Sequence, residues 1–459
     1  MTVGPARVVV VGAGIAGLAA AHELSGRGVA VTVREAGDRP GGKIRTTTFA
    51  GASLDLGADA FLARRPEAVE LCRELGLEGE LVAPATGAAY LWVDGRLRRL
   101  PGATLLGVPT QLGPLVRSRV LTPLGVVRAA VEPLVPGRRL NGDEALGRLV
   151  RRRFGAQVHQ RLVDPLVGGI SAGDIDRLSA ELAAPQLAAA ARSHRSLRAG
   201  ARALASATPS AGSSPFLTLP GGLSRLVDVL VQRLSRAGVD VRTGDPVERL
   251  ERSQNGGYLV VGRSGATSAD AVIVAAPGPV AATLLAPHAS ASARALAGID
   301  YASVTLVAFA YPPGAVARRL DGSGFLVARG EGRLMTACSW TSSKWAHVAA
   351  EGQVLLRVSA GRFGDQRAEH LSDDALVVAL RVELAEALGI VVPPVEVAVT
   401  RWPRAFPQYL PGHRQRLAAV EADLAHRLPG VALAGAALSG VGVPACIASG
   451  RAAARTALG

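Results

Sequence analysis

Apolar residues run without alternation through the first segment of the chain, in the stretch RVVVV from Arg7 to Val11. A strand whose successive side chains are all apolar is typical of a parallel sheet that is covered on both faces. The pattern becomes helical from Leu18 to Arg27 and ends at Gly28, and a second strand is predicted from Ala30 to Arg34. This order predicts the first strand, turn and helix of a nucleotide-binding fold.

Helical and strand patterns recur through the middle of the chain. Residues 66–80 are amphipathic and predict a helix, residues 98–140 are apolar, proline-interrupted and dotted with arginine and predict short helices, and residues 142–205 continue in helical character. Residues 206–215 (SATPSAGSSP) predict a loop. A helix is predicted from Leu223 to about Ala237, followed by strands at Val239–Arg242, Val247–Glu251, Tyr258–Arg263 and Ala271–Ala276.

Alternation of apolar and polar positions dominates residues 300–360, for example in SVTLVAFAY and GQVLLRVSAGRF. Such alternation predicts a large, mostly antiparallel sheet that forms a second domain. Residues 373–388 return to a helical pattern.

No charged residue occurs from Leu428 to Gly450, a stretch long enough to span a bilayer. Its many glycines and two prolines favour another interpretation: a strand over Val431–Ala434, a glycine-rich turn, and a helix that runs to about Leu458. Pro444 suits the first position of that helix. We therefore expect no transmembrane span.

Three glycines after the first strand give the spacing GxGxxG. Gly12 permits a sharp turn, Gly14 lets the backbone approach a pyrophosphate, and Gly17 lets the helix pack against the strand. Glu35 ends the second strand, where a carboxylate can accept both ribose hydroxyls and disfavours a 2′-phosphate, so NADP is not expected. A secretory signal peptide would require neither the second strand nor Glu35.

Two further glycine turns bear on the identity of the dinucleotide. In AGDRPGGKIRT, Gly41 and Gly42 let the chain pass close to a cofactor, and Lys43 and Arg45 are placed to meet phosphates. SLDLGADAF then offers a strand and a turn at Gly57. Together these segments resemble the flavin-binding, amine-oxidase-like branch of the fold.

The C-terminal turn GAALSGVG is predicted to complete the flavin site. Free N–H groups at the start of the following helix can face the pyrimidine edge of a flavin and stabilise negative charge there by about 0.3–1 kcal/mol. A closing helix without a ligand is the alternative. Val247 falls where its strand would lie against adenine.

Composition narrows the class of protein. The chain has 459 residues, 49% of them hydrophobic, which suits two or three globular domains. Its three cysteines are far apart and favour a reduced, cytosolic setting, and its eight histidines show no metal-ligand spacing, so no metal is expected. The net charge is +14, almost all from arginine. Without a basic stripe interleaved with aromatic residues, nucleic acid is not expected, whereas a carboxylate-rich substrate or an acidic membrane surface remains open.

Several stretches make the chain similar, over nearly its full length, to the FAD-dependent coproporphyrinogen III and protoporphyrinogen oxidases of haem biosynthesis. They are GADAFLARRP, DPLVGGISAGD, LPGGLSRLVDVL, SSKW, RWPRAFPQYLPGH and GVGVPACIASGR. Ala58, Ala60 and Ser171 depart from residues that are common in that family. The resemblance implies an α/β fold with a Rossmann-like FAD-binding domain (1–88, 206–280 and 406–459), an antiparallel-sheet substrate domain (89–97 and 281–405) and a helical cap (98–205).

The same resemblance implies one non-covalent FAD per chain. Its implied contacts are Gly12, Ala13, Gly14, Ile15, Ala16, Gly17, Glu35, Ala36, Lys43, Gly57, Ala58, Asp59, Ala60, Val247, Trp402, Val441, Gly442 and Val443. The implied reaction removes hydride from porphyrinogen meso carbons to the flavin three times, and oxygen takes up the electrons as hydrogen peroxide.

No residue is predicted with certainty to be catalytic. Lys344 is a candidate for holding a water near the flavin, with an ordinary surface lysine as the equal alternative. Tyr409 and His413 are candidates for general bases, with a surface role as the alternative. Trp402 can pack on the flavin or serve core packing alone.

The substrate is expected to be coproporphyrinogen III, since the basic chain suits the more anionic of two porphyrinogens. Protoporphyrinogen IX is the alternative. Arg64 and Arg65 are candidate carboxylate partners, with a solvated turn as the alternative. We expect a cytoplasmic protein, and peripheral contact at the inner face of the membrane and handover of product to a downstream haem-pathway enzyme are open possibilities.

Two other functions compete. An amine oxidase of the same superfamily shares the fingerprint, and some of these enzymes attach flavin covalently through a cysteine; Cys446 lies near the corresponding region, although we expect no covalent bond. A prenyl-protein escort protein uses the fold for binding without flavin. The complete pyrophosphate turn, Glu35 and the C-terminal glycine turn favour a cofactor.

Overall fold

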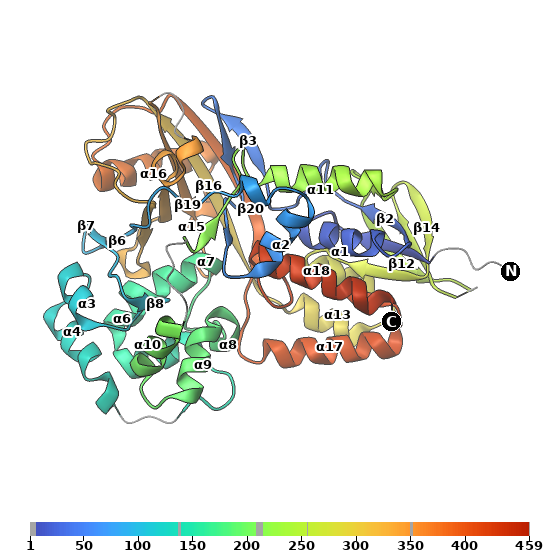
Figure 1. Cartoon of the computed structure of the whole chain (residues 1–459), viewed down its shortest axis with the longest axis horizontal. Helices are drawn as coiled ribbons and strands as arrows, with labels where there is room; N and C mark the ends of the chain where they lie inside the picture. Colours follow the sequence, from blue (N-terminus) through green and yellow to red (C-terminus); the bar gives the residue numbers. More distant parts are fainter. Residues whose placement is uncertain (1–5, 136–138, 208–213, 255, 349–351, 459) are drawn as a thin grey trace.

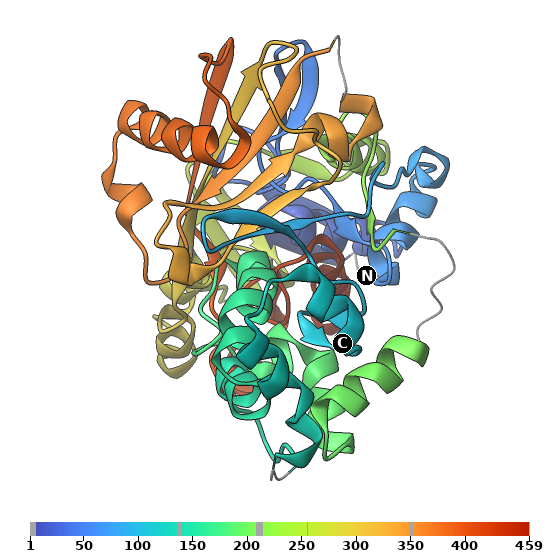
Figure 2. The ribbon, with the colours of Figure 1, turned by 90° about the vertical axis from the view of Figure 1, so that its left-hand side faces the viewer.

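The computed structural model describes residues 6–135, 139–207, 214–254, 256–348 and 352–458. Its elements form three regions. Figure 1 shows a parallel sheet with its helices on the right, a large sheet at the upper left and a group of short helices at the lower left. Figure 2, turned by 90°, shows the large sheet above the short helices.

A five-stranded parallel sheet underlies the right-hand region. Its order is β11 (Asp240–Arg242), β2 (Ala30–Arg34), β1 (Arg7–Val11), β15 (Ala271–Val274) and β21 (Val431–Leu433). Strands from the two ends of the chain therefore lie in one sheet, and their carboxyl ends share one edge.

The four valines of β1 divide between two cores. Val8 and Val10 pack with the helices on one face, and Val9 and Val11 pack with the elements on the other. The first face carries α1 (Ile15–Ser25), α11 (Ser224–Arg236) and α18 (Val443–Leu458). The second carries β12 (Val247–Arg252), β13 (Tyr258–Gly262), β14 (Gly265–Ala269), α12 (Gly278–Leu285), α13 (Ser290–Ala297) and α17 (His413–Arg427). Burial on both faces explains why the strand shows no polar alternation.

The strands predicted at Arg7–Val11 and Ala30–Arg34 are confirmed with those bounds. The first helix begins at Ile15 rather than Leu18, because the glycine turn enters the helix directly, and it ends at Ser25. The helix predicted over 66–80 is shorter: α2 (Pro66–Glu74) is followed by a left-handed Gly76, with φ of +77°, and a 3₁₀ turn at Glu78–Glu80. β14 completes a hairpin that the sequence pattern did not indicate.

A seven-stranded sheet forms the upper-left region. Its order is β20 (Glu396–Pro407), β16 (Tyr301–Tyr311), β19 (Val354–Ala360), β18 (Met335–Trp340), β17 (Gly324–Val327), β6 (Tyr90–Val93) and β7 (Arg96–Arg99). All neighbours are antiparallel except β17 and β6. The predicted antiparallel sheet is thus confirmed, and α16 (Asp373–Leu388), predicted with the same bounds, packs on it.

Short helices form the lower-left region, as the sequence predicts for residues 98–140 and 142–205. They are α3 (Leu112–Ser118), α4 (Pro123–Ala130), a 3₁₀ turn (Glu132–Leu134), α5 (Leu146–Phe154), α6 (Ala156–Val158), a π-helix (His159–Gly168), α7 (Gly169–Ser171), α8 (Ala180–Ala183), α9 (Pro185–Ser193) and α10 (Leu197–Ala207). A small hairpin, β8 (Thr104–Leu105) and β9 (Val108–Pro109), precedes them. Of the loop predicted over 206–215, residues 208–213 lie outside the described residues, and 206–207 belong to α10.

The remaining elements connect these regions. They are β3 (Thr46–Phe49), β4 (Ala52–Asp55), β5 (Phe61–Leu62), β10 (Phe216–Leu217), 3₁₀ turns at Arg329–Glu331 and Ala346–Val348, α14 (Thr341–Lys344) and α15 (Arg367–His370). The domain boundaries predicted from the sequence stay a prediction.

The uncharged C-terminal stretch forms a strand, a turn and a helix, β21 and α18, as predicted. Pro444 is the second residue of α18 rather than the first, because Val443 already lies in the helix. Within the described residues no helix combines the length and apolar character that crossing a bilayer needs.

Candidate functional site

A cavity of about 510 Å³ runs along the carboxyl ends of the parallel strands. We call it the strand-end cavity. Its wall includes residues just after the ends of β1, β2, β15 and β21, among them Gly12, Glu35, Ala275 and Gly435. Ligands of open α/β sheets bind at this edge, where the loops after the strands diverge.

The three glycines of the fingerprint have different surroundings. A Cβ on Gly12, whose φ is +103°, would lie 2.9 Å from the carbonyl oxygen of Ala275. A Cβ on Gly17 would overlap the carbonyl oxygen of Gly12. A Cβ on Gly14 would have no protein atom within 4 Å, and Gly14 lines the cavity. Gly12 and Gly17 therefore serve the turn and the helix packing, whereas Gly14 keeps open the space beside the start of α1.

Glu35 lies at the wall of this cavity with its carboxylate fixed by backbone groups. Oε2 accepts a hydrogen bond from the Ala13 N–H at 2.7 Å, and Oε1 accepts one from the Gly37 N–H at 2.8 Å. Each oxygen retains a further lone pair for a hydroxyl donor. The carboxylate is thus oriented before any ligand binds.

The residue before Glu35 is a buried arginine. The side chain of Arg34 is fully buried and forms two 2.7 Å hydrogen bonds to the Asp245 carboxylate. The hydrogen bonds from Arg34, with further ones from Ser264, hold the pKa of Asp245 well below its usual range. The pair connects the end of β2 to the segment just before β12. Val247, the first residue of β12, lines the strand-end cavity. The sequence pattern gave no sign of this pair.

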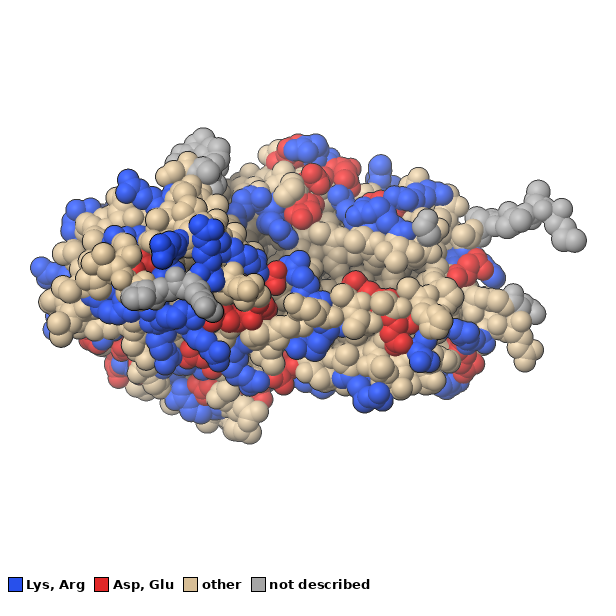
Figure 3. All heavy atoms as spheres, turned by 90° about the horizontal axis from the view of Figure 1, so that it is seen from below, with Lys and Arg blue, Asp and Glu red and all other residues tan. Residues whose placement is uncertain are grey.

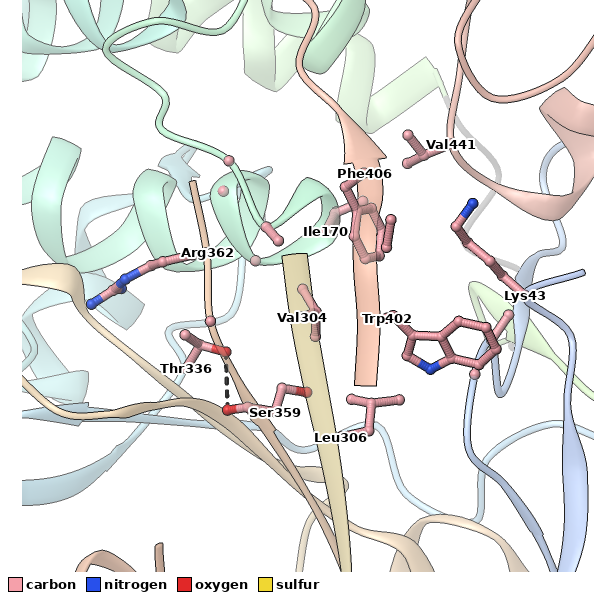
Figure 4. A pocket seen from close by; sticks show the side chains of 18 of the residues that line it. Lys43, Ile170, Val304, Leu306, Thr336, Ser359, Arg362, Trp402, Phe406 and Val441 are labelled. Carbon is pink, nitrogen blue, oxygen red and sulfur yellow. Dashed lines mark hydrogen bonds between the residues drawn. The ribbon is translucent and has the colours of Figure 1, made fainter. Parts of the chain in front are cut away.

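A second cavity, of about 330 Å³, lies between the seven-stranded sheet and the π-helix. We call it the sheet cavity. Apolar side chains form much of its wall, namely Ile170, Val304, Leu306, Val327, Trp402 and Phe406. Figure 4 shows Val304, Leu306, Trp402 and Phe406 side by side on neighbouring strands.

The two cavities share part of their wall. Lys43, Ala58, Ala405, Ala436 and Val441 line both. A molecule in the strand-end cavity would therefore reach the edge of the sheet cavity, and a second molecule in the sheet cavity would lie against it.

Lys43 is the charged residue at this junction. Burial lowers the pKa of its ammonium. Within the described residues Lys43 forms no hydrogen bond or ion pair through that group, so its charge is available to whatever occupies the junction.

The loop after β4 is held by the seven-stranded sheet. Asp59 pairs with Lys344 (Nζ to Oδ2, 2.7 Å) and with Arg357 (Nη2 to Oδ1, 3.0 Å). Burial alone would raise the pKa of Asp59, but Arg357 and Lys344 together hold it well below its usual range. The indole N–H of Trp402 donates to the Leu56 carbonyl at 2.7 Å. These contacts fix Gly57 and Ala58 in the wall of the sheet cavity.

The structure brings most of the predicted flavin contacts to one place. The strand-end cavity is lined by Gly12, Gly14, Ile15, Ala16, Glu35, Ala36, Lys43, Ala58, Val247, Val441 and Val443. The sheet cavity adds Gly57, Asp59 and Trp402. Four predicted contacts, Ala13, Gly17, Ala60 and Gly442, are not among the described lining residues of either cavity.

The other candidate residues lie outside both walls. Arg64 and Arg65 are exposed on the segment after β5. The Tyr409 hydroxyl donates to the Ala436 carbonyl, and His413, whose ring lies 4.9 Å from that of Tyr409, contacts two carbonyl oxygens. Both are buried, so the surface role considered for them is wrong. Lys344 is also no ordinary surface lysine, since it is paired with Asp59.

Four charged residues of the sheet cavity escaped the sequence analysis: Asp164, Arg329, Arg357 and Arg362. Asp164 lies in the DPLVGGISAGD stretch, whose likeness to a family could have singled it out. The three arginines are indistinguishable in sequence from the many arginines of the surface.

Comparison with known proteins adds three findings. A family model described as flavin containing amine oxidoreductase matches residues 15–458. The curated coproporphyrinogen III oxidase of Bacillus subtilis is 36% identical over 100% of this chain and 99% of its own length, and that of Mycobacterium leprae is 40% identical over 96% of each chain. A crystal structure from Exiguobacterium, provisionally assigned as a protoporphyrinogen oxidase, is 31% identical with a TM-score of 0.88 over 98% of each chain.

Proposed function

The chain belongs to the flavin-containing amine oxidoreductase family, and we propose that it oxidises coproporphyrinogen III to coproporphyrin III with FAD in haem biosynthesis. The observation that carries this proposal is the pair of cavities with a common wall. One has the features of a dinucleotide site, and the other is an apolar space large enough to admit part of a second molecule. The full-length likeness to curated coproporphyrinogen III oxidases supports the choice of substrate.

The residues present fit FAD. The open space at Gly14 and the start of α1 suits a pyrophosphate, because N–H groups of a helix N-terminus bind anions. The oriented carboxylate of Glu35 suits ribose hydroxyls. Val441, in the turn before α18, Val443, the first residue of α18, and Lys43 would lie at the other end of the cofactor.

Bound FAD supplies the acceptor for the hydride equivalents that the porphyrinogen loses, a role that no amino-acid side chain can take. The chain binds and orients both partners. Val304, Leu306 and Phe406 present an apolar face to a macrocycle and exclude water from it. Asp59, held by two cations, keeps the loop with Gly57 and Ala58 in place between the two sites.

Molecular oxygen is the proposed final acceptor. Complete oxidation of the porphyrinogen removes six electrons and six protons, which reduce three oxygen molecules to hydrogen peroxide. The electrons and protons therefore balance without a further reactant.

Protoporphyrinogen IX is the second candidate substrate, favoured by the Exiguobacterium structure. It carries two propionates where coproporphyrinogen III carries four. An amine is less suited, because the wall of the sheet cavity carries more cations (Lys43, Arg329, Arg357 and Arg362) than carboxylates (Asp59 and Asp164), and this excess of positive charge would repel a cationic substrate.

Peripheral membrane contact and handover of the product are further parts of the proposal. Leu124 and Val127 of α4 and the nearby Leu134 are 81%, 58% and 82% exposed. Figure 3 shows basic side chains gathered on the left of the view, over the short helices. Apolar side chains among basic ones suit an acidic lipid surface. Flotation with anionic and with neutral vesicles tests the contact. If the protein floats with neither kind of vesicle, the membrane contact is excluded.

The proposed function is tested by offering both porphyrinogens, prepared without oxygen, to the FAD-loaded protein. Porphyrin fluorescence and peroxide are then followed after oxygen is admitted. We expect faster porphyrin formation from coproporphyrinogen III. Formation of no porphyrin from either compound, with oxidation of an amine by the same preparation, would overturn the proposal.

A further inference from the structure

Two arginines line the sheet cavity at a distance from the junction with the strand-end cavity. Arg329 begins the 3₁₀ turn after β17, and Arg362 follows β19 and the left-handed Gly361. Figure 4 shows Arg362 on the opposite side of Val304 from Lys43 and Trp402. A molecule that touches Lys43 at one end and passes along the apolar wall would therefore meet Arg362 at the other.

The guanidinium of Arg362 has no hydrogen-bond partner among the described residues. Only 9% of its side chain is exposed, and its Nε is buried without a partner. The carboxylate of Asp365 is 3.9 Å away, and Asp365 is instead bonded by Arg367 at 2.7 Å. A buried group with five donors and no acceptor is unusual, because buried polar groups are normally satisfied.

Only some of the hydrogen-bond donors of Arg329 have an acceptor. Its terminal nitrogens donate to the carbonyls of Phe363 (3.3 Å) and Gly173 (3.0 Å), which orient the group. Its Nε is buried without a partner, and the carboxylate of Asp164 lies 3.9 Å away. Asp164, with 7% of its side chain exposed, leaves one net positive charge among Asp164, Arg329 and Arg362.

Another buried arginine of this chain, Arg34, has hydrogen-bond acceptors that Arg362 lacks. Arg34 makes two 2.7 Å bonds to Asp245 and two more to carbonyls. Burial and the neighbouring charge of Arg329 lower the pKa of Arg362, which indicates that its charge is poorly compensated by the protein. Because Arg362 lines the sheet cavity, a molecule that enters this cavity can supply the missing acceptors.

We propose that Arg362, together with Arg329, binds a carboxylate of the substrate inside the sheet cavity. Guanidinium groups bind carboxylates through paired, charge-assisted hydrogen bonds, and these bonds gain strength where water is excluded. The carbonyl contacts of Arg329 orient its guanidinium, while the guanidinium of Arg362 has donors that form no hydrogen bond within the described residues. The inference rests on the proposed function, since a propionate of a porphyrinogen is the carboxylate concerned.

The test measures binding of coproporphyrin III and of its uncharged tetramethyl ester to the FAD-loaded protein by fluorescence titration. Wild type, Arg362→Gln, Arg362→Lys and Arg414→Gln are compared; Arg414 is exposed and lines neither cavity in the described structure. Loss of a charge-assisted hydrogen bond predicts about 10- to 100-fold weaker binding of the acid to Arg362→Gln. Arg362→Lys should recover part of the loss, and binding of the ester and the behaviour of Arg414→Gln should stay unchanged.

A second measurement separates this role from a structural one. Because Arg362 is buried without a hydrogen-bond acceptor and its nearest carboxylate, that of Asp365, is 3.9 Å away, Arg362→Gln should melt at the same temperature as ligand-free wild type or higher. Equal binding of the acid by wild type and Arg362→Gln, or an equal loss for acid and ester with a lower melting temperature, would overturn the inference. Failure of the proposed function is distinguishable from failure of this inference, because in that case the wild-type protein would oxidise no porphyrinogen. A wild type that binds no coproporphyrin III would count against both.

Discussion

The ammonium of Lys344 lies 2.7 Å from Oδ2 of Asp59, and the two residues are separated by 285 positions in the chain. Lys344 ends α14, which lies between β18 and β19 of the seven-stranded sheet, whereas Asp59 lies in the loop after β4. Arg357 of β19 holds the other oxygen of the same carboxylate. One carboxylate thus links the wall shared by the two cavities to the sheet that covers it.

Removal of Asp59 should destabilise the protein more than removal of Lys344. Asp59→Asn leaves two cations facing each other without an anion, whereas Lys344→Met leaves Asp59 paired with Arg357. Since removal of one partner of a buried pair costs about 3–5 kcal/mol, we expect Asp59→Asn to lower the free energy of unfolding by about 3 kcal/mol and Lys344→Met by less. Urea unfolding of the FAD-loaded variants measures both.

The double variant is the control for this interpretation. If the two side chains interact directly, Asp59→Asn with Lys344→Met should lose less stability than the sum of the single changes, by about 0.5–3 kcal/mol. Strict additivity would show that the 2.7 Å contact contributes nothing.

Gly14→Val should abolish flavin retention and leave the fold intact. Gly14 has an ordinary φ of −66°, and a Cβ there would meet no protein atom, so the added side chain enters the strand-end cavity. Flavin absorbance after gel filtration and circular dichroism of the same sample measure the two properties. In the matched change, Gly17→Val, the side chain would collide with the Gly12 carbonyl, and the fold itself should fail. Normal flavin content in Gly14→Val would mean that the cofactor lies elsewhere.

The parallel sheet could be predicted from sequence because burial on both faces leaves an unbroken apolar run. β1 was predicted with its observed bounds for this reason. β20 was missed, although its residues were noted for their likeness to a family. It is an edge strand, which tolerates Pro403 and Pro407 and exposes charged residues, so neither a continuous nor an alternating apolar pattern marks it.

The glycine turns of the strand-end cavity could be predicted from the sequence, whereas the buried arginines could not. Backbone turns such as that at Gly12 require particular residue types at fixed spacing, and spacing can be read directly. Arg34 and Arg362 are buried by segments distant in sequence, and nothing within a few residues distinguishes them from exposed arginines. Arg64 and Arg65 were therefore chosen as carboxylate partners, whereas Arg329, Arg357 and Arg362 are the arginines that line the sheet cavity.

Denaturation should release the flavin. Cys446 lines the strand-end cavity, but burial raises the pKa of its thiol to about 11, so the reactive thiolate is scarce at neutral pH. We expect a colourless precipitate and a yellow supernatant after acid treatment, and equal flavin content in Cys446→Ser. A yellow precipitate from wild type that turns colourless in Cys446→Ser would establish a covalent bond.

Asp55 should make stability depend on pH between about 4 and about 6. Burial raises the pKa of its carboxyl to about 6, despite hydrogen bonds from the Thr46 hydroxyl at 2.5 Å and the Leu223 N–H at 3.1 Å. The folded protein therefore holds this proton more tightly than the unfolded chain, whose aspartates titrate near 3.9. Its contribution to stability is complete below that value and is lost as the pH rises through about 6, by about 3 kcal/mol at most.

Asp55→Asn isolates this contribution, because the amide oxygen can accept the same two hydrogen bonds but carries no charge at any pH. The melting temperature of the variant should rise relative to wild type as the pH increases from about 4.5 to 7.5, and the difference should level off above that range. Asp228→Asn changes an exposed position of α11, and the difference between its melting temperature and that of wild type should not rise in this way with pH. A gap between Asp55→Asn and wild type that is constant or shrinks with rising pH would show that Asp55 is ionised throughout, and that its two donors outweigh its burial.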